Sequence, residues 1–161
     1  MSIGVNPCLS TESFNPPTPC EIPVNGFGFG HKLRIVGMPV IDQQQKRFEV
    51  NMYTRNNNAF HFNPRFDEKQ TMLNNTQKTG NWQKEQRCQF PFEYGKMFTL
   101  DFVATPGHIR VLHDGQPLTE FAERDNSATI NRIQINGCIQ DKLWPTFRRS
   151  LSHLHSNDDL L

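Results

Sequence analysis

Short stretches in which apolar and polar residues alternate recur along the chain from His31 onward. Because successive side chains of a β-strand point to opposite faces of a sheet, this period of two predicts strands with one buried face. The apolar positions are Leu33 and Ile35; Phe48, Val50 and Met52; Phe60 and Phe62; Phe98, Leu100 and Phe102; Ile109 and Val111; and Ile133 and Ile135. We therefore expect these residues to form the hydrophobic core.

Turn-forming residues separate the alternating stretches. They are Asn25-Gly26, Asn56-Asn57-Asn58, Thr79-Gly80-Asn81, Tyr94-Gly95-Lys96, Pro106-Gly107 and Asp114-Gly115. Many short strands at regular intervals, without long helical patterns between them, are typical of an antiparallel β-sandwich. The prediction is an all-β fold built from two antiparallel sheets.

The beginning of the chain departs from this pattern. Residues 1–23 include Asn15-Pro16-Pro17-Thr18-Pro19, which fixes backbone dihedrals and removes amide donors. We expect an arm or an edge cover over residues 1–23, followed by one domain over residues 24–143.

The tail, residues 144–161, also differs. Pro145 is expected to break any strand, and Phe147, Leu151 and Leu154 recur at helical spacing. The tail is expected to be either a short helix lying on the domain or a loose segment.

Length and charge exclude several classes of protein. A chain of 161 residues suits one domain with a substantial core, and its net charge of +1 has Lys and Arg scattered among Asp and Glu. Without a basic stripe, nucleic acid is not an expected partner. The first residues carry neither a positive start nor an apolar run, and no stretch of about 18 consecutive apolar residues occurs. We expect no membrane insertion and synthesis in the cytosol.

The cysteines agree with a cytosolic origin. Cys8, Cys20, Cys88 and Cys138 lack both the dense framework of a small secreted domain and a Cys-x-x-Cys metal spacing. They are expected to be free thiols, most simply small core hydrophobes.

Polar and aromatic residues gather in one short part of the chain. His61-x-Asn63-Pro64-Arg65 is followed by Asn75 and then by Trp82-x-x-Glu85-x-Arg87. Strand alternation places His61, Asn63 and Arg65 on one face, with Phe60, Phe62 and Phe66 on the opposite, core-facing side. Proline is poor in a central strand, and such a local conflict is typical of a functional site.

These seven residue types, in this order, resemble the carbohydrate-recognition signature of the galectin family. The resemblance covers roughly Val24 to Leu143. It implies a two-sheet jelly roll and a non-enzymatic, metal-independent lectin that binds β-galactosides on glycoproteins or glycolipids. Galectins are made without signal peptides and also act outside the cell, so a cytoplasmic protein with an additional extracellular role is expected.

The resemblance also implies a role for each signature residue. Galactose carries its 4-hydroxyl axially, and a hydroxyl can both donate and accept hydrogen bonds. The implied partners of that hydroxyl are His61, Asn63 and Arg65, and those of the 6-hydroxyl are Asn75 and Glu85. Trp82 would cover the apolar face of the sugar. Glu85 and Arg87 would reach a second sugar.

Fine specificity is left open by the sequence. The connection from Arg65 to Asn75 is a couple of residues shorter than in many galectins, and it flanks the expected groove together with the loop from Arg55 to Ala59. Arg55 could contact a substituent on the 3-position, such as sialic acid or sulfate, or could be an ordinary loop charge.

Enzymatic and metal-binding alternatives have little support. Glycosidases typically need two carboxyl groups that flank the bond, but Glu85 has Arg87 two residues on, which favours the ionised form over a general acid. Asp67 and Glu68, in the adjacent turn, are expected to be solvated. His153-x-His155 resembles no full ligand set, so no catalytic residue, metal or cofactor is predicted.

The main alternative is a binding module of another kind, a galectin-like fold whose main partner is a protein. The amino-terminal arm or the tail from Trp144 to Leu161 would then be the docking site. A homodimer could also form through terminal edge strands, unless the proline-rich arm covers that edge.

Overall fold

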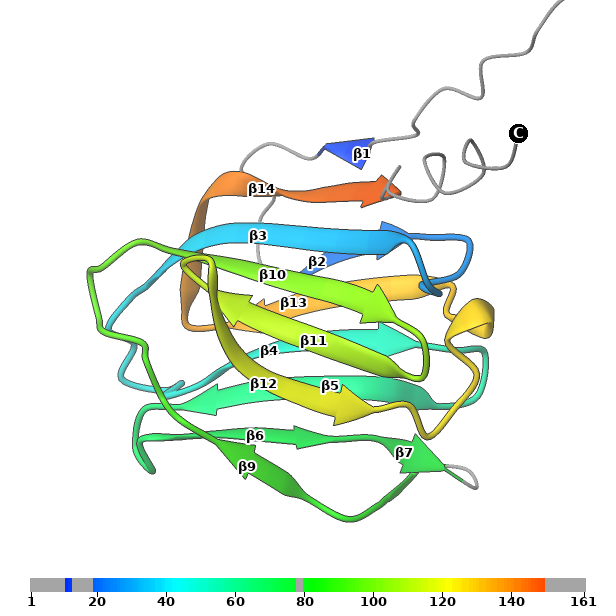
Figure 1. Cartoon of the computed structure of the whole chain (residues 1–161). Helices are drawn as coiled ribbons and strands as arrows, with labels where there is room; N and C mark the ends of the chain where they lie inside the picture. Colours follow the sequence, from blue (N-terminus) through cyan, green and yellow to red (C-terminus); the bar gives the residue numbers. More distant parts are fainter. Residues whose placement is uncertain (1–10, 13–18, 78–79, 150–161) are drawn as a thin grey trace, which may run out of the picture.

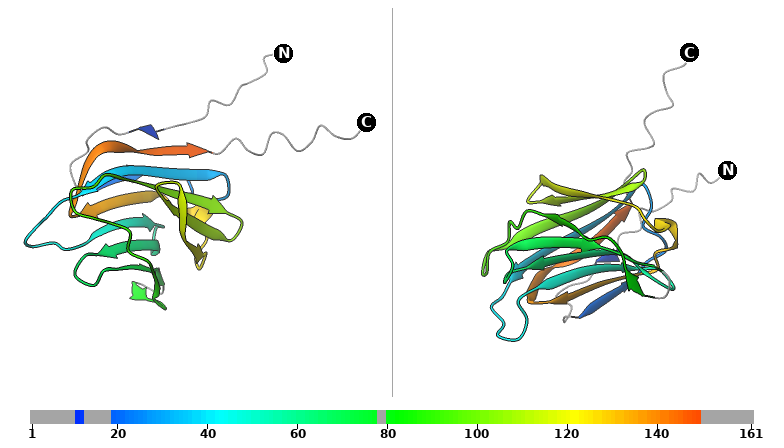
Figure 2. Two further views of the ribbon diagram at one scale, coloured as in Figure 1. Left: turned by 60° about the vertical axis from the view of Figure 1, so that its left-hand side comes forward. Right: turned by 90° about the horizontal axis from the view of Figure 1, so that it is seen from below.

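The computed structural model describes residues 11–12, 19–77 and 80–149, which form two stacked antiparallel sheets (Figures 1 and 2). The first, called the β3 sheet, has the order β1 (Thr11–Glu12), β14 (Ile139–Arg149), β3 (His31–Pro39), β10 (Phe98–Thr105), β11 (His108–His113) and β12 (Gln116–Ala122). The second, called the β5 sheet, has the order β2 (Cys20–Pro23), β13 (Arg132–Gly137), β4 (Phe48–Tyr53), β5 (Asn58–Arg65), β6 (Gln70–Asn74) and β9 (Gln86–Cys88). A small hairpin of β7 (Thr76–Gln77) and β8 (Asn81–Trp82) extends from the end of β6, and a short 3-10 helix, η1 (Ser127–Thr129), precedes β13.

The core lies between the two sheets, as the alternation predicted. Every apolar position named from the alternation is at most 4% exposed. Aromatic rings join the layers: Phe48 stacks on Phe98 with centroids 5.5 Å apart, and Phe62 meets Phe102 edge to face at 5.2 Å. The predicted two-sheet all-β sandwich is therefore confirmed, and each fully buried aromatic side chain stabilises it by roughly 1.5–3 kcal/mol.

The arm contributes to the sandwich itself. Cys20 to Pro23 form β2, which pairs with β13 at the edge of the β5 sheet, in the register Ile22↔Ile133. Thr11 and Glu12 pair with β14 at the edge of the β3 sheet. Both pieces therefore lie along sheet edges.

The expectation that Pro145 breaks any strand is wrong. β14 continues to Arg149 and pairs with β3 on both sides of the proline. The pairing register shifts between Gln140 and Leu143 and again between Leu143 and Pro145. At such irregularities some residues need not donate a backbone hydrogen bond to the neighbouring strand. The strand can therefore continue through the proline, which has no N–H. Leu151 and Leu154 lie outside the described residues.

Candidate functional site

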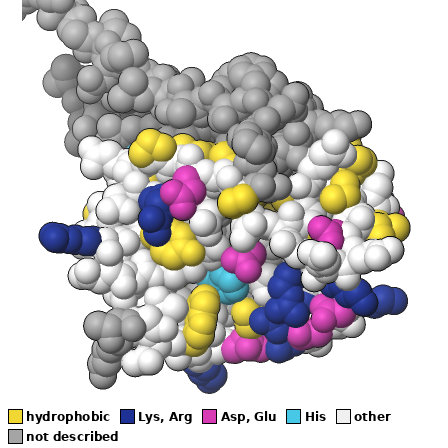
Figure 3. All heavy atoms as spheres, turned by 180° about the vertical axis from the view of Figure 1, so that it is seen from behind, with side chains coloured by type: hydrophobic (Ala, Val, Ile, Leu, Met, Phe, Trp, Pro, Cys, Tyr) yellow, Lys and Arg dark blue, Asp and Glu magenta, His cyan; other side chains and the backbone are white. Residues whose placement is uncertain are grey.

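A groove of about 460 Å³ crosses the outer face of the β5 sheet (Figure 3). That face shows a histidine beside acidic, basic and apolar side chains. The groove is lined by Arg47, Glu49, Asn51, Tyr53, Asn58, His61, Asn63, Arg65, Met72, Asn74, Trp82, Gln83 and Glu85.

Strand register brings the polar residues together. His61 lies opposite Asn51 of β4 and Asn74 of β6, so three polar side chains form a row across the sheet. Asn63 lies opposite Met72 in the next row on the same face. The predicted grouping of His61, Asn63 and Arg65 on one face is therefore what the strand produces.

Pro64 determines how Asn63 is oriented. Extending the register Val50↔Phe62 by two residues places the Phe48 carbonyl opposite Pro64, which has no N–H to donate. The Asn63 side-chain Nδ2 donates to the Phe48 oxygen instead, at 2.9 Å. The Asn63 Oδ1 then accepts from the Arg65 Nε at 2.8 Å. The proline thus leaves a gap in the ladder that a site residue fills.

A carboxylate fixes the tautomer of His61. The Glu49 carboxylate can only accept hydrogen bonds, and its Oε2 accepts one from the Asn51 Nδ2 at 2.9 Å. The amide is thereby oriented with its Oδ1 toward His61. The His61 Nδ1 lies 2.5 Å from that oxygen and must be the protonated nitrogen, which leaves Nε2 as an acceptor. Burial lowers the pKa of His61 below its ordinary value; Arg65 lowers it as well, and Glu49 opposes both. The imidazole is therefore neutral at pH 7.

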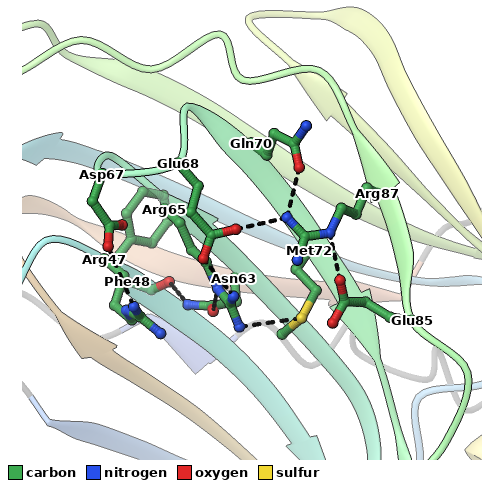
Figure 4. Close-up of polar contacts among 10 residues, drawn as sticks. All are labelled: Arg47, Phe48, Asn63, Arg65, Asp67, Glu68, Gln70, Met72, Glu85 and Arg87. Atoms are coloured by element: carbon green, nitrogen blue, oxygen red, sulfur yellow. Dashed lines mark hydrogen bonds and ion pairs between the residues drawn. The ribbon is translucent and has the colours of Figure 1, made fainter.

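A chain of alternating charges continues from Arg65 along one side of the groove (Figure 4). Glu68 accepts from the Arg65 Nη1 at 2.7 Å and from the Arg87 Nη1 at 2.6 Å. Arg87 also pairs with Glu85 and donates to the Gln70 Oε1 at 2.6 Å. Hydrogen bonds from the two arginines hold the pKa of the Glu68 carboxyl below its ordinary value, and the bond from Arg87 has the larger effect.

Glu68 is exposed to solvent, as expected, and its carboxylate also bridges the two arginines. Asp67 pairs with Arg47 at 3.6 Å. Arg87 does not line the groove, whereas Glu85 does. The ion pair between them holds Arg87 next to Glu85. The pairing of Glu68 with Arg87 was not predicted because it joins residues 19 apart in the sequence, a tertiary contact without a local pattern.

Trp82 supplies a broad apolar surface at the groove. It ends β8, its side chain is 55% exposed, and its ring centroid lies 4.9 Å from that of His61 at an interplanar angle of 54°. A large aromatic group so exposed beside buried polar groups is suited to cover the apolar face of a ligand.

Asn75 lies elsewhere than the signature suggests. It is fully buried and is not a lining residue, whereas its neighbour Asn74 lines the groove opposite His61. The Asn74 Nδ2 donates to the Gln83 oxygen at 3.0 Å. Arg55 is exposed in the loop between β4 and β5 and is not a lining residue.

Known proteins resemble this chain in sequence and in fold. Residues 17–143 match the model of the galactoside-binding lectin family. The chain belongs to the galectin family. It is similar to galectin-6 of Mus musculus, with 32% identity over 133 residues that cover 80% of this chain and 44% of that protein. The 32 kDa beta-galactoside-binding lectin of Haemonchus contortus is 35% identical over 127 residues, covering 77% of this chain and 44% of that protein.

Solved galectin structures share the fold. The crystal structure of Caenorhabditis elegans galectin LEC-6 superposes with a TM-score of 0.76 and 37% identity, over 85% of this chain and 94% of that chain. Sheep galectin-11 superposes with a TM-score of 0.74 at 20% identity. This galectin chain spans less than half the length of the curated relatives named above.

Other features of this galectin concern metals, thiols and membranes. Within residues 11–12, 19–77 and 80–149, no group of three or more His, Cys, Asp or Glu could hold a metal ion. Cys20 and Cys138 are buried, and Cys88 is partly buried. Burial raises the pKa of the Cys138 thiol to about 11. Cys8, His153 and His155 lie outside the described residues. In the part of the chain that the structure describes, no helix is long and apolar enough to cross a bilayer.

Proposed function

We propose that this galectin binds lactose-type and N-acetyllactosamine-type β-galactosides in the groove of the β5 sheet. The observation that carries the proposal is the row of oriented polar groups, His61, Asn63 and Arg65, beside the exposed indole of Trp82. This arrangement needs no ion, so binding should persist in a chelator.

The axial 4-hydroxyl of galactose suits this row. His61 presents an acceptor at Nε2, and the Arg65 guanidinium, only 17% exposed, presents donors, so one hydroxyl can donate and accept at once. An equatorial hydroxyl, as in glucose, would leave buried polar groups unpaired, at about 1–3 kcal/mol each. Specificity for galactose should therefore arise mainly from that desolvation.

The other contacts follow from the walls of the groove. Trp82 would cover the C–H face of the galactose ring. Glu85 and, of the two adjacent asparagines, Asn74 would border the 6-hydroxyl, because Asn74 lines the groove and Asn75 does not. Glu85 and Arg87 would serve the second sugar through their shared ion pair.

Binding of a single disaccharide should be weak. About 23 heavy atoms at roughly −0.3 kcal/mol each give about −7 kcal/mol, a dissociation constant of about 10 µM or weaker. Clustered galactosides on glycoproteins or glycolipids are thus the proposed partners. A cytoplasmic protein that also acts outside the cell by a route independent of a signal peptide is the proposed localisation.

A lactose titration followed by tryptophan fluorescence tests the proposal. The background variant Trp144→Phe leaves Trp82 as the single tryptophan, and sucrose is the non-galactoside control. We expect a saturable change with lactose alone, unaffected by a chelator. Calorimetry on Arg65→Ala and Trp82→Ala should show no measurable lactose binding in proteins that keep a β-sheet circular-dichroism spectrum. Wild-type affinity in either variant would refute the assigned roles, and no response of the parent protein would favour a protein partner or a different glycan.

A further inference from the structure

Arg124 lies outside the groove but contacts the segment that carries Trp82. It follows β12, the edge strand of the β3 sheet, in the connection that leads through η1 to β13 of the β5 sheet (Figure 1). Its Nη1 donates to the Asn75 Oδ1 at 3.1 Å and to the Lys84 oxygen at 2.6 Å. One guanidinium thus joins the two ends of the segment 75–84.

Further contacts fix Arg124 itself. Its guanidinium carbon lies 4.7 Å from the centre of the Phe121 ring, and its backbone oxygen accepts from the Gln77 Nε2 at 2.6 Å. A cation over a core aromatic ring holds the side chain in place. Arg124 is therefore an ordered connection between one sheet and the hairpin attached to the other.

The hairpin is short, and other hydrogen bonds also reach it. The Asn58 N–H donates to the Thr76 Oγ1 at 2.7 Å, and the Asn74 Nδ2 donates to the Gln83 oxygen at 3.0 Å. β7 and β8 contain two residues each, in the register Thr76↔Trp82 and Gln77↔Asn81. A hairpin this short is not stable alone. Its base is closed by the Gln83 N–H, which donates to the Asn75 oxygen at 3.0 Å. Because the Trp82 side chain is mostly exposed, core packing does not hold the indole in place.

Asn75 makes the hairpin depend on Arg124. The Asn75 side chain is fully buried, and its Nδ2 has no hydrogen-bond partner in the described part of the chain. Arg124 supplies the contact to Oδ1. Without the guanidinium, both polar ends of a buried amide would be unpaired, so the base of the hairpin would have to open toward water.

We propose that Arg124 is a positioning residue for the sugar groove, which acts by holding the β7–β8 hairpin so that Trp82 stands beside His61. The role in sugar binding rests on the proposed function, whereas the hold on the hairpin does not. Arg124 is not a lining residue, and its proposed role is to position Trp82 rather than to contact the sugar.

The test compares Arg124→Met with Arg110→Met. Methionine keeps an apolar stem against Phe121 but removes the donors, and Arg110 is an exposed arginine on β11 that serves as the matched control. In the Trp144→Phe background without sugar, acrylamide quenching of Trp82 and hydrogen exchange of the Gln83 amide report the order of the hairpin. Lactose affinity is then measured by calorimetry. Arg124→Lys keeps a cationic donor.

For Arg124→Met we expect stronger quenching of Trp82, faster exchange at Gln83 and about tenfold weaker lactose binding, while Leu100 and Val111 amides keep their protection. Arg124→Lys should fall between parent and Arg124→Met. The proposal is overturned if Arg124→Met matches Arg110→Met in quenching and exchange, if the hairpin loosens with unchanged affinity, or if protection falls throughout the sandwich. If the parent binds no lactose, the proposed function fails by itself, and the sugar-free measurements still decide whether Arg124 holds the hairpin.

Discussion

At the scale of single residues, two amide side chains of the groove are oriented by groups that can only accept hydrogen bonds. The Glu49 carboxylate turns the Asn51 amide, and the Phe48 carbonyl turns the Asn63 amide. Each amide then presents its oxygen to the next residue, His61 or Arg65. The polar surface is therefore arranged before any ligand arrives, which reduces the entropy lost on binding.

The lowered pKa of His61 predicts how pH affects the protein. In the unfolded chain His61 takes up a proton near pH 6.5, whereas in the fold burial opposes protonation. The free energy of unfolding should therefore be unaffected by His61 above pH 6.5. It should fall as the pH decreases from there to the lower folded pKa, by at most about 1.4 kcal/mol per pH unit. Urea denaturation from pH 8 to pH 5 measures this.

Lactose affinity should fall in the same direction, because protonation removes the Nε2 acceptor. His61→Gln keeps an acceptor that does not titrate, and it leaves the groove carboxylates Glu49 and Glu85 unchanged. The pH dependence that remains in His61→Gln belongs to other groups, so identical profiles for the two proteins would contradict the role given to His61.

Sequence alone identified five of the thirteen residues that line the groove but not the lining residues of the neighbouring strand β4, such as Glu49 and Asn51. The five are His61, Asn63, Arg65, Trp82 and Glu85. His61, Asn63 and Arg65 follow from alternation along one strand. The side chains of the adjacent Asn74 and Asn75 point to opposite faces of the sheet. Only the pairing register His61↔Asn74 shows which of the two points to the groove. Arg124 contacts Asn75 across 49 residues, a tertiary contact that no local pattern predicts.

At the scale of elements, β5 is a central strand of its sheet that contains a proline, and the groove lies over this strand. Pro64→Ala would supply an N–H opposite the Phe48 carbonyl, which would compete with the Asn63 amide for that acceptor. We expect lactose affinity to fall by about three- to tenfold, with stability changed by less than about 1 kcal/mol. Calorimetry and thermal melts measure both, and Pro117→Ala in the edge strand β12 is the control. Unchanged affinity would show that Asn63 is oriented by other means.

A glycine at the end of β13 packs closely against the start of β4. Gly137 has φ +104°, and a Cβ there would lie 2.6 Å from the Phe48 Cα. Gly137→Ala should therefore destabilise the fold by more than about 2 kcal/mol, through both strain and collision. Urea denaturation measures this loss against Gly28→Ala, where a Cβ would meet no atom within 4 Å. Equal midpoints for the two variants would be inconsistent with a strained Gly137.

The elements that alternation predicted are those with a buried apolar face. The missed strand β12 has one buried residue, Phe121, and its polar sequence gives little alternation. β14 was missed because Pro145 was taken to end it, while the shifts of register that accommodate the proline depend on pairing with β3. Strand pairing therefore formed elements that the local pattern does not specify.

At the scale of the molecule, the short strand β1 covers the edge of the β3 sheet that β14 would otherwise form. The outer edge of β14 is paired with two residues of β1, in the register Thr11↔Phe147 and Glu12↔Thr146. An unpaired strand edge is a template for another chain. A variant without residues 1–13 should therefore associate, so that its apparent mass in sedimentation equilibrium rises with protein concentration. A variant without residues 1–9, which keeps β1, should keep a constant apparent mass. A monomer mass for both truncations would show that β1 does not protect this edge.

The position of Asn74 in the groove has a consequence for how the protein can be produced. Asn74-Asn75-Thr76 is an acceptor sequence for N-linked glycosylation, which acts on chains entering the secretory pathway. In the fold, the Asn74 side chain lines the groove opposite His61 and donates to Gln83. A sugar chain attached there would stand inside the groove and break that bond. If the protein were fused to a secretion signal and made in eukaryotic cells, its own modification would block the groove.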